Sequence, residues 1–293
     1  MIEQFLNYLR YERNASPQTV LTYEEGLREF ESYLTFRDEG LSLEKVDSDL
    51  IRDWMESLMD KGNTASTINK KLSALRSFYR FALKRRLVDK DPAHCITGPK
   101  KSKPLPQFLR ESEMDNLLDM IEWGDSLKDV RARTILILLY EAGLRRSELT
   151  GLNDADVDFS AGQLKVTGKR NKQRIIPFGE ELFQVLSHYI AVRDEQVERK
   201  TEGALFLNDR GERMTGEQVY VIVRKYLTAV TSLKKRSPHV LRHTFATAML
   251  NNGAGLESIK NLLGHESVST TEIYAHTTFE QLKRVYKEAH PRA

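Results

Sequence analysis

The stretch Gln163-Leu-Lys-Val-Thr-Gly168-Lys-Arg-Asn-Lys-Gln173-Arg-Ile-Ile-Pro177 decides the fold class of this chain. Two short runs flank a polar turn that begins at Gly168, which is the pattern of a strand, a turn and a second strand. Elsewhere, apolar residues recur at the three- and four-residue spacing of helices. The sequence therefore predicts a mainly α protein, in which a small antiparallel sheet gives the second part an α+β character.

Helices are predicted on both sides of this hairpin. Ser16 followed by Pro17 favours a helix start, because serine caps free backbone N–H groups and proline fits the first turn. The first part is expected to hold helices at residues 2–11, 17–34, 47–59 and 64–86. The second part is expected to hold them at residues 111–123, 127–141, 180–198, 215–230, 238–251, 256–263, 270–275 and 279–289.

A change of composition divides the chain. Residues 89–106 hold four of its eight prolines, which is typical of an extended connection between domains. We therefore expect a four-helix domain at residues 1–87, a basic linker at 88–109 and a larger domain at 110–293.

Positive charge is concentrated around that boundary. Residues 64–104 contain eleven Lys and Arg against two acids, a net charge of +9, while the whole chain carries only +3. Such a run is either a solvated face or a surface for a polyanion, and its place on a helix and linker favours double-stranded DNA. The predicted DNA-binding residues are Lys70, Lys71, Arg76, Arg80, Lys84, Arg85, Arg86, Lys100, Lys101 and Lys103.

Length and composition exclude several classes. The longest apolar run, Ile135 to Tyr140, is about a third of the roughly 18 residues that cross a bilayer, so no membrane association is expected. The N-terminal residues do not form an export signal, and the single cysteine, Cys95, excludes an internal disulfide framework. We expect a globular protein of the reducing cytoplasm.

The most informative motif is Ser237-Pro238-His239-Val240-Leu241-Arg242-His243. Ser237 and Pro238 mark a helix start, so His239 and Arg242 lie three apart on the same face of its first turn. Free N–H groups and the helix dipole favour an anion there, and an arginine fork with a histidine suits a phosphate. The alternative is a surface helix with chance His and Arg.

Four further residues are candidates, each with a simpler alternative. Arg145 follows Gly143 at a helix end, where an arginine often only neutralises the helix dipole. Lys169 lies at the hairpin turn, where most lysines are merely solvated. His265 follows a helix-ending glycine, and Tyr274 lies nine residues further among polar neighbours, where a tyrosine is more often a packing residue.

Taken together and in order, these residues resemble the tyrosine recombinase family. Its pattern of Arg, hairpin Lys, His-x-x-Arg, Gly-His and Tyr is matched by Arg145, Lys169, His239, Arg242, His265 and Tyr274. The basic helical first part also resembles the core-binding domain of that family, with its SAM-like fold. The resemblance therefore covers most of the chain.

The resemblance implies a mechanism. Arg145 and Arg242 would hold the phosphate oxygens, His239 would accept the proton of Tyr274, and His265 would donate to the phosphate. Lys169 would protonate the departing 5′ oxygen. The 3′-phosphotyrosine product keeps the energy of the phosphodiester, so rejoining needs no ATP or other cofactor, and no metal is expected.

The resemblance also implies partners. The last helix carries an apolar stripe, which either packs on its own domain or, as in this family, docks on a neighbouring protomer of a homo- or hetero-tetramer on two DNA sites. Its members are Phe279, Leu282, Val285, Tyr286 and Ala289. The motif strings look closest to the bacterial Xer (XerC/XerD-like) site-specific recombinases, which resolve chromosome dimers with a septal DNA translocase.

Other functions remain open at this point. Within the family they are a mobile-element integrase or a DNA invertase, and a type IB topoisomerase shares the chemistry. From other classes they are a non-catalytic architectural DNA-binding protein, and a metal hydrolase that uses His239, His243 and His265.

Overall fold

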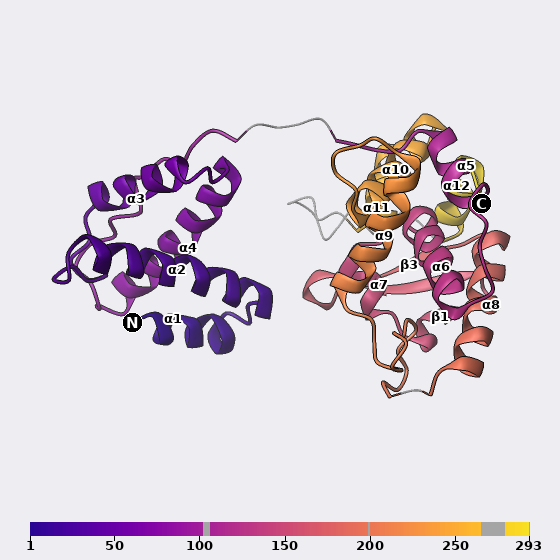
Figure 1. Ribbon diagram of the computed structural model, residues 1–293, viewed down its shortest axis with the longest axis horizontal. Coiled ribbons are helices and arrows are strands. Elements are labelled where there is room, and N and C mark those ends of the chain that lie inside the picture. The colour runs from indigo at the N-terminus through magenta and orange to yellow at the C-terminus, as the bar shows by residue number, and fades with distance from the viewer. Residues whose placement is uncertain (102–105, 199, 265–278, 293) are drawn as a thin grey trace. The chain divides into compact units, whose positions relative to one another are not determined.

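The computed structural model describes residues 1–101, 106–198, 200–264 and 279–292, and the chain divides into two compact units, Met1–Pro104 and Leu105–Ala293. Figure 1 shows that the first unit is made of helices and that the second combines helices with a small sheet. The predicted fold class, mainly α with a small antiparallel sheet in the second part, is confirmed.

The helices of the first unit begin at side-chain caps. The Ser16 hydroxyl accepts from the Thr19 N–H at 3.2 Å, and an Asp47 carboxylate oxygen accepts from the Leu50 N–H at 2.8 Å, which satisfies N–H groups that have no partner within the helix. The elements are α1 (Ile2–Asn7), continued by a π-helical turn (Tyr8–Glu12), then α2 (Pro17–Arg37), α3 (Ser48–Asp60) and α4 (Ala65–Lys84).

Aromatic side chains fill the core of the first unit. Phe30 lies 4.7 Å from Trp54 between ring centroids, and Phe5 lies 5.6 Å from Phe78 edge to face. Since α4 directs its apolar residues into this core, its polar face is left for solvent or a partner.

The chain after α4 differs from the extended linker that the sequence suggests. Val88, Ala93 and Ile96 are buried in the core of the first unit. The Arg76 guanidinium donates to the carbonyls of Ala93 and Ile96, and the Asn69 amide donates to the Pro99 carbonyl at 2.8 Å. Packing against α4 therefore continues to about residue 99, and only a shorter segment is left to connect the units.

The second unit is built around α6 (Figure 1). Its residues 134–141 are all buried, and so are the next three residues of the chain. Because residues 135–140 in its second half are apolar on every side, α6 can be stable only with other elements around it. The helices are α5 (Glu111–Leu118), α6 (Leu127–Glu141), α7 (Arg146–Gly151), α8 (Glu180–Gln196), α9 (Gly216–Val230), α10 (Pro238–Asn251), α11 (Leu256–Leu263) and α12 (Phe279–Ala289). Within the described ranges, no helix combines the length and hydropathy that a membrane span requires.

The sheet is a hairpin with one added strand. β2 (Gln163–Thr167) pairs with β3 (Gln173–Pro177) in an antiparallel register that sets Leu164 opposite Ile176. A 3-10 turn, Lys169–Asn171, joins them, and the short β1 (Val157–Asp158) pairs with the outer side of β2. The hairpin was predicted, whereas β1 and α7 are too short to leave a periodic pattern. The helix expected at 270–275 lies outside the described residues.

Candidate active site

A buried carboxylate, Glu148, organises the site. It lies on α7, which begins directly after a sharp reversal of the chain at Gly143. Gly143 has φ +56°, and a Cβ there would come within 2.6 Å of the Phe245 ring, so only glycine fits. The Arg145 N–H donates to Glu148 Oε2 at 2.8 Å, so the carboxylate caps the start of α7 and turns inward at 4% exposure.

From this position the Arg145 side chain forms hydrogen bonds with α7 and with the end of α11. Its Nη1 donates to Glu148 Oε1 at 2.7 Å, and its Nη2 donates to the Gly264 carbonyl, at the end of α11, at 3.1 Å. The side chain is 32% exposed, so part of the guanidinium remains open to a ligand.

Arg242 approaches the same carboxylate from α10. Its Nη1 donates to the Gly143 carbonyl at 2.5 Å and lies 3.8 Å from Glu148 Oε2, while its Nη2 donates to the Leu263 carbonyl at 2.7 Å. Burial, and then the positive charge of Arg145, lower the pKa of Arg242 to about 10. The group is therefore still charged at neutral pH.

Arg174, on β3, completes the cluster. Its two terminal nitrogens donate to the two oxygens of Glu148 at 2.9 and 2.8 Å, and its Nε donates to the Leu262 carbonyl at 2.8 Å. Burial alone would raise the pKa of Glu148, but the hydrogen bonds and charge of Arg174, with those of Arg145, lower it to about 2. Glu148 is therefore a permanent anion among three arginines.

The structure thus brings Arg145 and Arg242 together, because both contact Glu148 and the last carbonyls of α11. The neighbouring Arg146 takes another direction. A Cβ on Gly216, at the start of α9, would lie 3.1 Å from Arg146 Nε, so that side chain lies against α9.

His239 lies one turn before Arg242 on α10 and is exposed. Partial desolvation, and then the charges of His243, Arg242, Arg146 and Arg145, lower its pKa. The three-residue spacing sets His239 on the same face of α10 as Arg242. His243 is also exposed on α10.

Lys169 is exposed at the tip of the hairpin, in the turn between β2 and β3. The residue before it, Gly168, lies close to the cluster, since a Cβ there would be 3.3 Å from Glu148 Oε1. Lys169 thus follows a residue whose backbone lies close to the central carboxylate.

The two remaining candidates, His265 and Tyr274, lie outside the described residues. His265 follows Gly264, which ends α11 with φ +63° and whose carbonyl accepts from Arg145. The chain therefore leaves the described part of the molecule directly beside the arginine cluster.

Sequence reasoning missed two residues of this cluster, Glu148 and Arg174. A signal for Glu148 was present, because an acid three residues after a helix start commonly caps it. Arg174 gave none, because a partly exposed arginine in a strand is unremarkable until the fold sets it opposite Glu148.

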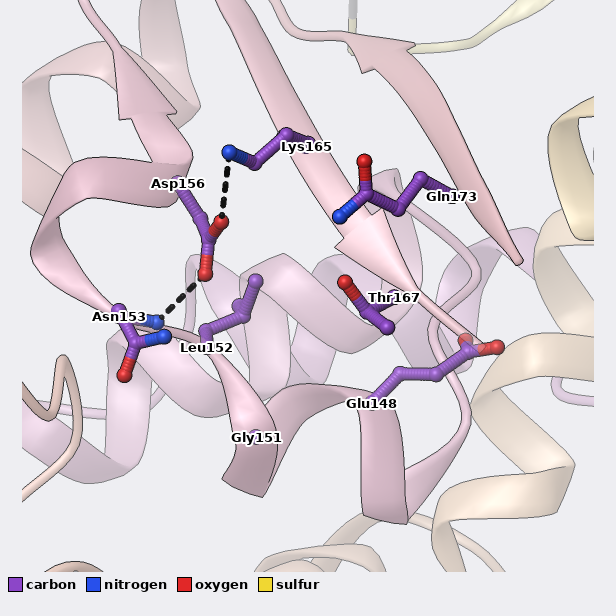
Figure 2. A pocket seen from close by; sticks show the side chains of 8 residues that line it. All are labelled: Glu148, Gly151, Leu152, Asn153, Asp156, Lys165, Thr167 and Gln173. Atoms are coloured by element: carbon purple, nitrogen blue, oxygen red, sulfur yellow. Dashed lines mark hydrogen bonds and ion pairs between the residues drawn. The ribbon is translucent and has the colours of Figure 1, made fainter. Parts of the chain in front are cut away.

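A cavity of about 390 Å³ lies beside Glu148, between the end of α7 and the hairpin. Figure 2 shows Glu148 and Leu152 on one side, and Thr167 and Gln173, from β2 and β3, on the other. Lys165 and Asp156 form an ion pair at 3.6 Å across its rim. Near its tip, therefore, the hairpin is separated from the end of α7 by a polar hollow on this side.

The basic residues of the first unit fall into two groups. Lys71 pairs with Glu29, Arg76 binds the carbonyls of Ala93 and Ile96, and Arg85 pairs with Glu12. The others within the described residues are exposed: Lys70, Arg80, Lys84, Arg86, Lys100 and Lys101. Lys103 lies outside the described residues.

The apolar stripe of α12 packs on its own unit. Tyr286 and Ala289 are buried in the core of the second unit, and Leu282 and Val285 pack against it. The Tyr286 hydroxyl donates to Oε2 of the buried Glu141 carboxyl group at 3.4 Å. Of the two placements that the sequence allowed, the structure thus shows packing of the stripe on its own domain.

Known proteins resemble this chain over its whole length. The phage integrase family matches residues 107–281, and the phage integrase N-terminal SAM-like domain matches residues 2–86. Tyrosine recombinase XerC of Pelotomaculum thermopropionicum is 39% identical over 301 residues, covering 100% of this chain and 98% of its own. Tyrosine recombinase XerD of Staphylococcus epidermidis is 35% identical over 297 residues, covering 100% and 99%. The solved XerH site-specific recombinase, bound to palindromic difH substrate in a post-cleavage complex, shares the fold with a TM-score of 0.72 at 24% identity, covering 97% of this chain and 83% of that one.

Proposed function

The chain belongs to the phage integrase family of tyrosine recombinases, and we propose that its arginine cluster binds the phosphate at which DNA is cut. It is a site-specific recombinase. The observation that carries the proposal is the pair Arg145 and Arg242, both held on Glu148 and on the Leu263 carbonyl. Two preorganised arginines stabilise the charge that develops on a phosphate under attack, and the partly open Arg145 offers the first contact.

Tyr274 is the proposed nucleophile. A free tyrosine has a pKa of about 10, so about one in a thousand is ionised at pH 7 and a proton acceptor is needed. His239 suits this task, because its lowered pKa keeps the ring neutral at pH 7. His265 is proposed as a donor to the same phosphate.

The cleavage step then balances as follows. The Tyr274 oxygen forms a bond to phosphorus while the bond from phosphorus to the 5′ oxygen breaks. The tyrosine proton passes to His239, and a proton from Lys169 passes to the 5′ oxygen, whose alkoxide is too basic to leave unaided. The reverse sequence, with a 5′-hydroxyl of another strand, rejoins the DNA without ATP. The proposal requires neither a metal nor a cofactor.

The first unit is proposed to bind double-stranded DNA through α4. Lys70, Arg80 and Lys84 are exposed and lie within an arc of about 80° at 100° per residue. Arg86, Lys100 and Lys101 extend the charge beyond the helix, and Lys103 is proposed as part of the same surface. Lys71, Arg76 and Arg85 contribute charge while holding intramolecular partners.

The biological role that we propose is Xer-type resolution of chromosome dimers in the cytoplasm. The support is that the chain is 39% identical to an XerC recombinase and 35% identical to an XerD recombinase, in each case over its whole length. The proposed assembly is a homo- or hetero-tetramer on two DNA sites, with α12 as the exchanged element and a septal DNA translocase as the partner that activates it.

Covalent trapping tests this function and finds the target. Nicked fragments of the chromosome of the source organism are incubated with the full-length protein and denatured, and the DNA that remains attached is sequenced. We expect attachment at a defined sequence with the native chain and none with Tyr274→Phe, because phenylalanine lacks the attacking oxygen. Tyr274→Phe should still shift the recovered duplex in a gel. An adduct of undiminished yield from that variant would refute the nucleophile.

A further inference from the structure

Arg174 connects three elements of the active-site cluster. It extends from β3, donates to both oxygens of Glu148 on α7 at 2.9 and 2.8 Å, and donates through Nε to the Leu262 carbonyl of α11 at 2.8 Å. Its side chain is 13% exposed. A planar guanidinium can satisfy these three acceptors at once, whereas the ammonium of a lysine cannot match the two oxygens bidentately.

Two glycines make room for this guanidinium. A Cβ on Gly264 would lie 3.0 Å from Arg174 Nη1 and 3.2 Å from its Cδ, so the turn that ends α11 is in close contact with the side chain. A Cβ on Gly168 would lie 3.3 Å from Glu148 Oε1 and 3.8 Å from Arg174 Nη1. The guanidinium therefore lies between the turn that precedes His265 and the backbone that precedes Lys169.

The ion pair is a direct link of the hairpin to α7, and it lies beside a cavity. The cavity between the end of α7 and the hairpin has Thr167 and Gln173 on its wall, which are the last residue of β2 and the first of β3. Figure 2 shows this hollow next to Glu148. Beside this hollow, the ion pair of Arg174 with Glu148 joins β3 directly to α7.

We propose that Arg174 is a positioning residue for proton donation to the leaving group: it holds the hairpin that carries Lys169 in register with Arg145 and Arg242. The role rests on the proposed function and extends it to a residue that need not touch DNA. Glu148 keeps two other arginine partners, Arg145 at 2.7 Å and Arg242 at 3.8 Å. Loss of Arg174 therefore leaves the phosphate-binding pair supported and affects chiefly the placement of Lys169.

The test uses a change of leaving group. The probe is a nicked duplex that carries the sequence recovered by covalent trapping, made once with the ordinary 5′ oxygen and once with sulfur in its place. A thiol has a pKa of about 8.5, so a thiolate departs without a proton donor, whereas an alkoxide does not. Adduct formation is followed in a single turnover with DNA saturated by the full-length protein, and DNA affinity is measured separately.

We expect Arg174→Lys to slow adduct formation on the oxygen substrate by ~10²-fold, the scale of a misplaced reacting group. On the sulfur substrate its rate should approach that of the native chain, and its DNA affinity should be unchanged on both. Lys169→Ala should show the same pattern. Arg131→Lys is the matched control, because Arg131 also joins one backbone carbonyl, Leu207 O at 3.0 Å, and one carboxylate, Asp209 at 2.8 Å, and is also largely buried. It should lower the melting temperature without slowing either reaction.

Three outcomes would overturn the proposal. The first is an unchanged rate for Arg174→Lys on the oxygen substrate. The second is an equal loss on both substrates, which would mean that Arg174 supports the fold or the arginine pair rather than proton donation. The third is that Arg174→Lys loses no more of the rate of adduct formation than Arg131→Lys does, when the two variants have the same melting temperature. If the native chain itself forms no adduct, the proposed function is refuted and this role falls with it.

Discussion

At the scale of single residues, Glu148 is the group on which the site depends. An isolated carboxylate buried to this degree would be costly, and three arginines offset that cost. The same contacts fix the arginines, so stability and the proposed phosphate binding share one carboxylate. The contribution of Glu148 to stability can be measured through the pH dependence of unfolding.

Glu148 should contribute stability that disappears in acid. Its pKa is about 2 in the folded protein against an ordinary 4.5, so the contribution is complete above about pH 4.5 and is lost as the pH falls towards 2. The shift corresponds to roughly 3 kcal/mol at neutral pH. Urea unfolding at pH 7 and pH 3 should show this loss in the native chain and not in Glu148→Gln. The exposed Glu122→Gln is the control, and parallel curves for the native chain and Glu148→Gln would contradict the assignment.

The sequence predicts this site only in part. Arg145, His239 and Arg242 stand in local motifs whose chemistry can be recognised without a fold. Glu148 and Arg174 are 26 positions apart, and Arg174 and Leu262 are 88 apart, so their meeting depends on how β3, α7 and α11 pack. Contacts between residues so far apart along the chain leave no periodic pattern in a single sequence.

At the scale of elements, α12 is the part whose sequence allowed two placements. Its stripe is amphipathic, and the pattern alone does not say which apolar surface it covers. The structure gives it polar anchors as well as apolar ones. Tyr286 reaches Glu141, and the Arg292 guanidinium beyond the helix donates to Glu181 at 2.8 Å. These partners come from α6 and α8, so α12 is tied to its own unit by contacts that the stripe does not encode.

The docking of α12 should weaken as the pH rises. Burial, and then the charge of Glu181, raise the pKa of Glu141 to about 8, although Tyr286 and Arg292 oppose this. The folded state therefore holds a proton that the unfolded state gives up near pH 4.5, and stability falls between about pH 4.5 and 8. We expect Glu141→Gln to raise the melting temperature at pH 9 more than at pH 5.

The control for this change is Glu122→Gln, which lies outside the cluster and should have the same effect at both values. Hydrogen exchange of the α12 amides would locate the change. An increase at pH 9 no larger than that at pH 5 would show that Glu141 is ionised in the folded protein.

At the scale of the whole molecule, charge is divided unevenly along the chain. Residues 64–104 carry +9, so the remainder sums to −6. The fold keeps much of this positive charge on the surface of α4 and the segment after it, because the apolar face of α4 is buried. A surface of this kind binds DNA by displacing counterions, and its signature is the salt dependence of affinity.

Replacing Arg80 and Lys84 by glutamate should weaken DNA binding and flatten its salt dependence. Each lost phosphate contact reduces the slope of log affinity against log salt by about 0.9. Titrations of a labelled duplex at several salt concentrations measure this. The control is Lys45→Glu with Lys61→Glu, which changes the net charge equally at exposed positions outside α4. If the slope of log affinity against log salt is equal for the two double variants, the basic run on α4 is an ordinary solvated face.

The anchoring of α12 has a consequence for the reach of the proposed nucleophile. Tyr274 stands five residues before Phe279, where α12 begins, and ten after Gly264. A chain extends by at most about 3.6 Å per residue, so Tyr274 cannot lie more than about 18 Å from the start of α12 or about 36 Å from the end of α11. While α12 stays docked, these two covalent tethers keep Tyr274 within that range of the unit that holds the arginines.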